Sequence, residues 1–267
     1  MQPDTEFYIG WQAQAPPGFT RTIRRSVAGL IILVPVVAFL IVHFQRGFSN
    51  ATFEYGTTTE LSGIFRRDPV PFLSIANGAD ISGKPVFQNI LLVAPGKFGF
   101  DHLEGAASLE NGQSLKVAGF LVYHDGKTAL EVHTIEKTGP GPKEAPRGLN
   151  LALGTVTLRG EITDPKCMLG VMKPGFGKPH LDCAARCIAG GIPPVLKVAN
   201  AAGETEYYLL AGPKGEALND CLPDFVADGV QVTGQLEQHG DWLVLYADPA
   251  HIRRVNKGAL NAGPMCN

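Results

Sequence analysis

The sequence predicts a mainly β protein in which one N-terminal transmembrane helix is followed by two tandem small Greek-key barrels of the OB-like type. Three observations predict this class: a single long apolar run near the N-terminus, a repeated pattern of short strands, and the abundance of turn-forming residues. Gly (32) and Pro (20) together make up 52 of the 267 residues. That share is high for a helical protein and natural for short strands joined by tight turns.

The apolar run comes first along the chain. Residues 27–44 read VAGLIILVPVVAFLIVHF, eighteen residues in which only His43 is able to carry a charge. This length approaches what a helix needs to span the hydrocarbon core of a bilayer. A cleaved signal peptide is the main alternative, but the run is longer than the apolar region of a signal peptide and no A-x-A-like site follows it. We therefore expect an uncleaved transmembrane helix over residues 26–45.

The basic residues near this run predict its orientation. Arg21, Arg24 and Arg25 precede it, whereas Arg46 is the only basic residue that closely follows it. The positive-inside rule then places residues 1–25 in the cytoplasm and the residues from about 47 onward outside it. The predicted location is the bacterial inner membrane, with a single pass and with the main domains in the periplasm.

The cytoplasmic segment contains aromatic residues that are unusual in a solvated tail, among them Tyr8 and Trp11. Such amphipathic rings suit the headgroup level of a membrane, and they equally suit docking against another membrane subunit. Together with Arg21, Arg24 and Arg25, they are the expected contacts with the membrane interface or with a partner.

The exported part of the chain contains two corresponding modules, residues 50–137 and 151–256. Between them lies a Gly/Pro-rich segment, residues 138–150, which reads as a linker, and residues 257–267 form a C-terminal tail. Each module has a stretch that alternates apolar and polar residues around a two-residue turn, a strong hairpin signal, at residues 115–132 and 230–247.

Each module also has a buried strand that runs into a Gly-Lys turn, at residues 91–99 and 208–215. Such internal similarity indicates a duplicated module of about five strands, for which an OB-like barrel is the best fit. A single sandwich of eight to ten strands is the alternative. The Gly-Lys turns are not P-loops, because they lack the GxxxxGK[ST] pattern.

Charge and motif content exclude several function classes. The net charge is −2, from 23 basic and 25 acidic residues, and neither module has a basic stripe interleaved with aromatic residues. These features argue against a nucleic-acid partner. The sequence also contains no G-x-S-x-G or H-E-x-x-H motif, so we expect a protein that is not an enzyme.

The second module carries an insertion, residues 164–194. Gly63 and Gly119 are 56 positions apart in the first module, and Gly160 and Gly234 are 74 apart in the second, a difference of eighteen. The insertion contains the cysteines and the histidine of greatest interest, which are Cys167, His180, Cys183 and Cys187. The last three are spaced i, i+3, i+7 and therefore lie on one face of a helix, which Gly190 and Gly191 would end.

Three interpretations of this cluster stay open. The first interpretation is a structural disulfide, because cysteines in the periplasm are readily oxidised. It would join Cys167 to Cys183 or Cys187, and the cysteine left over could pair with Cys221. The second is a metal site in which Cys167, Cys183 and Cys187 are thiolate ligands and His180 is the fourth ligand, a set that suits zinc or copper(I). The third is thiol redox chemistry near a helix N-terminus.

The insertion carries a distinctive sequence pattern. Residues 166–194 match the pattern KCxxGVMxPGxGKPHxxCAxxCIxGGIPP. This pattern resembles that of an uncharacterised bacterial family of membrane-anchored proteins with β-rich exported domains. The resemblance implies the same architecture and does not imply a defined activity.

The architecture is also faintly similar to that of the periplasmic haem chaperones of cytochrome c maturation, which join one N-terminal anchor to an OB barrel. Those proteins use a histidine in an HDxxY-like motif near the C-terminus. Here His124 and Asp125 lie inside a hairpin, and nothing equivalent is found near the end of the chain. This departure argues against haem carriage.

These observations lead to an expectation about function. One anchor, duplicated binding-type barrels and no catalytic motif predict a non-catalytic accessory or scaffolding subunit of a bacterial membrane complex, such as an electron-transfer complex. The expected partners are the bilayer and other subunits of that complex, with no cofactor. The alternative is a periplasmic metal-binding or thiol-redox protein that acts through Cys167, His180, Cys183 and Cys187, with zinc or copper as the metal.

Overall fold

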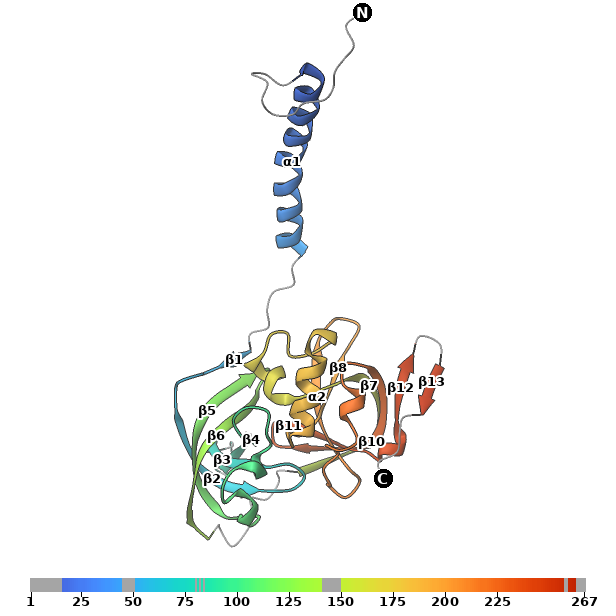
Figure 1. Cartoon of the computed structure of the whole chain (residues 1–267). Coiled ribbons are helices and arrows are strands. Elements are labelled where there is room, and N and C mark those ends of the chain that lie inside the picture. The colour runs from blue at the N-terminus through green and yellow to red at the C-terminus, as the bar shows by residue number, and fades with distance from the viewer. Residues whose placement is uncertain are drawn as a thin grey trace, which may run out of the picture. The chain divides into compact units, whose positions relative to one another are not determined.

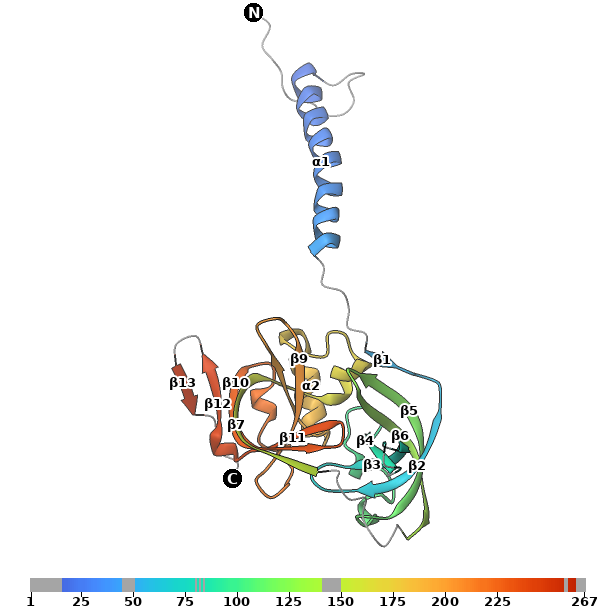
Figure 2. The same cartoon turned by 180° about the vertical axis from the view of Figure 1, so that it is seen from behind.

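The computed structural model describes residues 16–44, 51–79, 81, 83, 85–140, 150–256 and 259–262. It divides into two compact units, residues 1–48 and 49–267. The fold class predicted from the sequence is confirmed: the protein is mainly β, with one N-terminal apolar helix and two tandem OB-like barrels (Figures 1 and 2).

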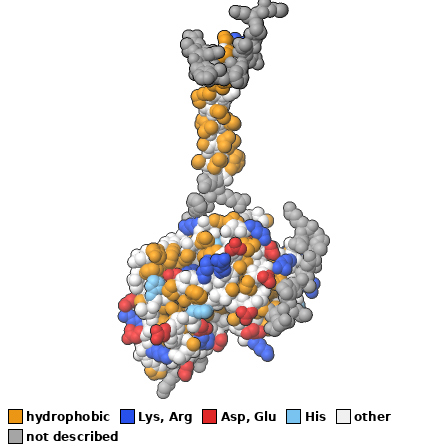
Figure 3. All heavy atoms as spheres, in the orientation of Figure 1, with side chains coloured by type: hydrophobic (Ala, Val, Ile, Leu, Met, Phe, Trp, Pro, Cys, Tyr) orange, Lys and Arg blue, Asp and Glu red, His pale blue; other side chains and the backbone are white. Residues whose placement is uncertain are grey.

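The first unit contains helix α1 (Pro17–Phe44), which is 28 residues long and has no buried residue within its own unit. Hydrophobic side chains cover it along most of its length (Figure 3). Among the described residues, α1 is the helix that is long and apolar enough to cross a membrane.

The boundaries of α1 differ from the sequence prediction at its start. The helix begins at Pro17, about a turn before Arg21, so Arg21, Arg24 and Arg25 lie within it rather than ahead of it. Proline suits the first turn of a helix, and arginine is a good helix former, so nothing stops the helix at residue 26. Tyr8 and Trp11 lie outside the described residues.

The first barrel contains five strands, β2 (Thr59–Arg66), β3 (Phe72–Ala79), β4 (Pro85–Val93), β5 (Ser114–His124) and β6 (Lys127–Gly139). Strand β2 pairs antiparallel with β3, β3 with β4, and β5 with both β2 and β6, while β4 pairs parallel with β6. This closes the sheet in the strand order of an OB fold. The short strand β1 (Thr52–Phe53) pairs with the end of β5. Two short helical turns, η1 (Phe100–His102) and η2 (Ala106–Ser108), lie between β4 and β5.

The second barrel repeats this order with β7 (Asn150–Thr163), β8 (Val195–Ala199), β9 (Thr205–Ala211), β10 (Gly229–His239) and β11 (Trp242–Tyr246). The pairings are equivalent, including the parallel pair of β9 and β11. Strands β12 (Ile252–Asn256) and β13 (Ala259–Ala262) extend the sheet beyond β10. Two short helical turns, η5 (Pro223–Phe225) and η6 (Pro249–His251), complete this half.

The predicted hairpins are confirmed as the pairs β5–β6 and β10–β11. Asp125 and Gly126 form the turn of the first pair, both with positive φ, as a tight two-residue hairpin turn requires. The predicted linker begins inside β6 and ends at the first residue of β7, and residues 141–149 lie outside the described residues.

The two barrels share one apolar core. Phe72 and Leu91 of the first barrel belong to the same buried cluster as Leu169 and Trp242 of the second. The rings of Phe72 and Trp242 have centroids 6.2 Å apart. Burial of large side chains from both barrels in one cluster holds the barrels together, because apolar surface removed from water is the main stabilising contribution to folding.

A buried asparagine adds polar specificity to this interface. The backbone N–H of Asn89 in β4 donates to Asp241 Oδ1 at 3.0 Å, and its side-chain amide donates to the carbonyl oxygen of His239 at 3.0 Å. The carbonyl oxygen of Asn89 accepts from Trp242 Nε1 at 3.0 Å. Three hydrogen bonds from one residue thus join β4 to the β10–β11 hairpin and fix how the barrels meet.

Candidate metal-binding site

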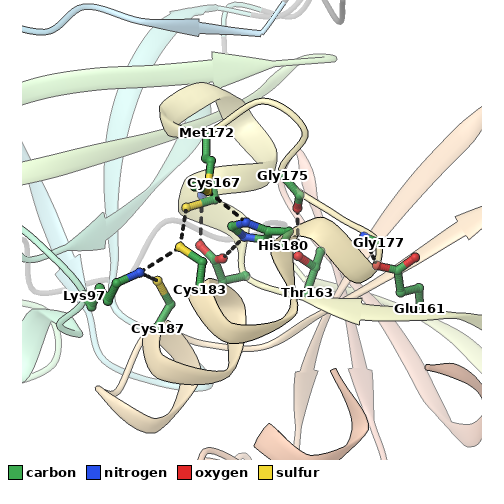
Figure 4. Close-up of polar contacts among 11 residues, drawn as sticks. Lys97, Glu161, Thr163, Cys167, Met172, Gly175, Gly177, His180, Cys183 and Cys187 are labelled. Carbon is green, nitrogen blue, oxygen red and sulfur yellow. Dashed lines mark hydrogen bonds and ion pairs between the residues drawn. The ribbon is translucent and has the colours of Figure 1, made fainter. Parts of the chain in front are cut away.

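The insertion lies where the sequence predicts it, in the second barrel. It forms the connection between β7 and β8, residues 164–194, whereas the equivalent connection of the first barrel is only residues 67–71. It contains a helical turn η3 (Cys167–Val171), a second turn η4 (Lys178–His180) and helix α2 (Leu181–Ala189). Figure 4 shows how side chains from these elements converge.

Helix α2 confirms the helical spacing predicted for this segment. His180 occupies the position just before the helix, and Cys183 and Cys187 follow one turn apart on the same side (Figure 4). Gly190 ends the helix, and its backbone N–H donates to the carbonyl oxygen of Arg186 at 2.9 Å. The sequence thus places a histidine and two cysteines on one helical face.

Cys167, Cys183 and Cys187 are free thiols in the structure. The Sγ atoms of Cys167 and Cys183 are 3.9 Å apart, well beyond the roughly 2 Å of a disulfide bond. The predicted disulfide within this cluster is therefore not confirmed. Cys221 lies elsewhere, packed against the core of the second barrel.

A buried carboxylate orients the histidine. Asp164 and His180 are 0% and 1% exposed, and Asp164 Oδ2 lies 2.8 Å from His180 Nε2. The other carboxylate oxygen of Asp164 accepts the backbone N–H of Cys167 at 2.9 Å. When Nε2 carries the proton that is donated to Asp164, the Nδ1 lone pair is available to a metal, which is the common arrangement for metal-binding histidines. Nδ1 lies 3.1 Å from Met172 Sδ.

The first barrel contributes a lysine to the site. Lys97 lies in the Gly-Lys turn after β4, and its ammonium group lies 2.7 Å from Cys183 Sγ and 3.9 Å from Cys187 Sγ. The hydrogen bond with Cys183 raises the pKa of Lys97. The same turn contacts the end of α2 directly, because the backbone N–H of Gly99 donates to the carbonyl oxygen of Gly190 at 2.8 Å.

The close approach of the Lys97 turn to the end of α2 depends on glycine. A Cβ atom added to Gly190 would lie 1.9 Å from the carbonyl oxygen of Lys97, and one added to Gly99 would lie 2.1 Å from the carbonyl oxygen of Gly191. No other residue type fits at these two positions without moving backbone. The Gly190-Gly191 pair therefore ends the helix and also admits the lysine turn.

A second lysine fastens the insertion to the first barrel. Lys166 is 2% exposed, and its ammonium group forms an ion pair with Glu131 of β6. It also donates to the carbonyl oxygens of Ala94 and Gly96, at 2.9 and 2.8 Å. These carbonyls belong to the turn that carries Lys97, so Lys166 fixes the position of that turn.

The thiol groups of Cys167 and Cys187 shift each other's pKa. A hydrogen bond between Cys167 and Cys187, together with burial, raises the pKa of Cys167. The same hydrogen bond lowers the pKa of Cys187, against the effect of its own burial. Within this pair, Cys187 is the residue that ionises first.

Two overlapping sets of ligand atoms lie within 4.8 Å of one another: Cys167, His180 and Cys183, and Asp164, Cys167 and Cys187. Both oxygens of Asp164 already form hydrogen bonds, so the first set is the better candidate for a metal site. Two thiolates bound to a tetrahedral metal at about 2.3 Å have sulfur atoms about 3.8 Å apart. The 3.9 Å between the Sγ atoms of Cys167 and Cys183 matches this spacing.

The sequence analysis named four candidate ligands, and the structure brings three of them into one set. Cys187 falls into the second set instead. Sequence reasoning missed Lys97, Asp164, Lys166 and Met172. The Gly-Lys turn was detectable as part of the repeat, but only the packing of the two barrels shows that its lysine reaches the cysteines.

Comparisons with known proteins add little to this geometry. No family model matches the chain, and no curated protein matches it, so the resemblance of residues 166–194 to a bacterial family stays a prediction. One similar solved structure is a deletion mutant of the single-stranded DNA binding protein from Thermus aquaticus, at 16% identity and a TM-score of 0.21, covering 79% of this chain and 91% of that chain. The sequence analysis excluded nucleic acid as a partner. This neighbour contradicts that exclusion, which is withdrawn, although so distant a likeness does not assign nucleic-acid binding to this chain.

Proposed function

We propose that this chain is a membrane-anchored protein that binds one soft metal ion, copper(I) or zinc, through Cys167, Cys183 and His180. The observation that carries the proposal is the convergence of two thiols and an imidazole nitrogen with the spacing of a tetrahedral metal site. Thiolate and imidazole ligands together select soft or borderline metals over calcium and magnesium, which prefer oxygen.

The surroundings of the three ligands support this function. Asp164 positions His180 through a buried hydrogen bond, and the ammonium group of Lys97 offsets part of the negative charge that two thiolates bring. Cys167 and His180 are almost fully buried, whereas Cys183 is partly exposed. Two of the three ligands are therefore shielded from solvent, and the third is accessible to it.

Metal uptake by the full chain tests the proposal. The protein is purified in detergent under reducing conditions, stripped with a chelator and titrated separately with copper(I) and zinc(II). We expect one metal per chain and protection of Cys167 and Cys183 against alkylation. His180→Gln should weaken binding by roughly tenfold or more, whereas the exposed His251→Gln is the matched control and should not. A chain that takes up neither metal contradicts the proposal.

We also propose that α1 anchors the chain in the bacterial inner membrane with both barrels in the periplasm. Its length and apolar composition support the anchor, and the arginines near its start support the orientation. Protease added to spheroplasts should digest the barrels and leave a fragment with the N-terminus protected. Digestion only after lysis would reverse the orientation.

The accessory-subunit hypothesis is a second candidate. It is supported by a group of aromatic residues on the first barrel, in which the exposed ring of Tyr55 packs against the half-buried rings of Phe53 and Phe120. Phe120 also contacts Phe53 and His133. Tyr55 is 77% exposed, and aromatic surfaces of this kind are enriched at protein interfaces. Purification in mild detergent tests it: co-purifying subunits would support the hypothesis, and a lone monomer would contradict it.

A further inference from the structure

We propose that Met172 is the fourth ligand of the metal site and that its thioether makes the site selective for monovalent copper over zinc. This inference rests on the proposed function and adds the identity of the metal to it. It starts from a contact that no sequence motif indicates, the 3.1 Å between Met172 Sδ and His180 Nδ1.

The backbone brings Met172 back over the site. Met172 directly follows the turn η3, whose first residue is Cys167, and its own backbone is extended. Gly170 within this turn has a φ of 145°, which only glycine adopts without strain, and a Cβ at this position would lie 3.0 Å from the backbone nitrogen of Thr52. The reversal at Gly170 therefore lets one short segment supply both Cys167 and Met172.

Met172 contacts the histidine of the ligand set, whereas Cys187 groups with other side chains. Cys187 groups with Asp164 and Cys167, shares a hydrogen bond with Cys167 and lies 3.9 Å from the ammonium group of Lys97. Met172 instead faces His180 Nδ1, the imidazole nitrogen that Asp164 does not contact (Figure 4). The four ligand atoms are then two thiolate sulfurs, one imidazole nitrogen and one thioether sulfur.

The exposure of Met172 adds a reason to regard it as a ligand. Its side chain is 44% exposed, whereas Met168, four residues earlier, is 5% exposed and packs in the shared core. Met172 is therefore not needed to fill the core. Because it is partly exposed and still contacts the buried His180, its sulfur is available to a metal that His180 binds.

The chemistry of a thioether decides which ion this set prefers. Thioether sulfur is soft and neutral, and it binds copper(I) well, whereas zinc(II) takes thiolate, imidazole and carboxylate ligands. Loss of Met172 should therefore weaken copper(I) binding and leave zinc(II) binding almost unchanged. A site whose fourth ligand is Cys187 would show no such difference.

The test compares Met172→Leu with Met168→Leu in the full chain, reduced and in detergent. Leucine has nearly the volume of methionine and lacks the sulfur, so both variants should fold. Affinities for copper(I) and zinc(II) are measured by competition with chromophoric chelators, and X-ray absorption counts the sulfur ligands of bound copper(I). We expect Met172→Leu to weaken copper(I) binding by about tenfold or more and to remove one of three sulfur ligands, with zinc(II) affinity within about threefold of wild type.

Each outcome is informative. Copper(I) binding that is unchanged in Met172→Leu, or copper(I) with three sulfur ligands in that variant, would overturn this inference and leave the proposed function standing. Equal losses for both metals would overturn the selectivity. A loss in Met168→Leu as large as that in Met172→Leu would show that core packing, rather than a thioether ligand, determines binding. A wild-type chain that binds neither metal would instead refute the proposed function.

Discussion

The ammonium group of Lys97 in the first barrel lies 2.7 Å from the Sγ atom of Cys183 in the second, although 86 residues separate them along the chain. This positive charge would offset part of the negative charge that the thiolate ligands of the proposed metal site bring. The site thus depends on a residue from outside the insertion.

Replacement of Lys97 tests this dependence. We expect Lys97→Met to lower metal affinity by roughly tenfold, the size of effect typical for a residue that supports the ligands without binding the metal. Lys214 lies in the equivalent Gly-Lys turn of the second barrel, is exposed, and provides the matched control Lys214→Met. Metal titration measures both, and equal affinities in the two variants would contradict a role for Lys97.

Gly190, at the end of α2, should be as important as Lys97 for the contact between the lysine turn and the insertion. We expect Gly190→Ala to destabilise the chain by about 1–3 kcal/mol and to weaken metal binding, because its Cβ would lie 1.9 Å from the carbonyl oxygen of Lys97. Gly229→Ala is the control, since the nearest atom to a Cβ there is 3.6 Å away. Thermal unfolding and metal titration are the measurements. Wild-type behaviour of Gly190→Ala would show that the turn tolerates displacement.

The buried ion pair between Lys166 and Glu131 leads to a stability prediction. Lys166→Met leaves Glu131 buried with His133 Nε2, 3.4 Å from its Oε1 atom, as its ion-pair partner, and breaking a buried pair in this way costs up to about 3–5 kcal/mol. The double variant Lys166→Met/Glu131→Leu should recover much of this loss, because it leaves no uncompensated charge. Chemical unfolding of the two single variants and the double variant measures the coupling. Additive losses would show that the two side chains act independently.

The stability of the protein should depend on pH through Asp241, which lies at the interface between the barrels. Burial raises the pKa of Asp241, and its buried Oδ2 atom has no hydrogen-bond partner within the part of the chain that the structure describes. The folded protein therefore holds this proton more tightly than the unfolded chain does. Its contribution to stability is fully present below the unfolded pKa and is lost as pH rises through the folded pKa.

Asp241→Asn should accordingly raise the free energy of unfolding at neutral pH, while its amide oxygen still accepts the N–H of Asn89. The difference between variant and wild type should shrink as pH falls through the folded pKa of Asp241. Unfolding curves over this range measure the effect. A difference that does not change with pH would mean that Asp241 does not titrate in that window.

Much of the fold was predictable because it is encoded locally. Two-residue turns such as Asp125-Gly126 specify hairpins, and the recurrence of these signals predicted two barrels in tandem. The spacing of His180, Cys183 and Cys187 specified one face of α2 in the same way. Helix α1 begins at Pro17, ahead of the predicted membrane span, because the arginines before the span continue the same helix.

The site was less predictable because it depends on packing between distant segments. Asp164 and Met172 lie close to the cysteines in sequence, but nothing in their spacing shows that both face His180. Lys97 reaches the cluster only because the barrels share a core and because glycines admit its turn. Local periodicity carries no information about such contacts.

The glycine contacts between the lysine turn and α2 also limit how far either barrel can be studied by itself. The first barrel supplies Lys97 and the carbonyl oxygens that hold Lys166, while the second supplies the cysteines of the proposed site. A fragment that contains only the second barrel would therefore keep Cys167, Cys183 and Cys187 and lose the side chain and the backbone that pack against them.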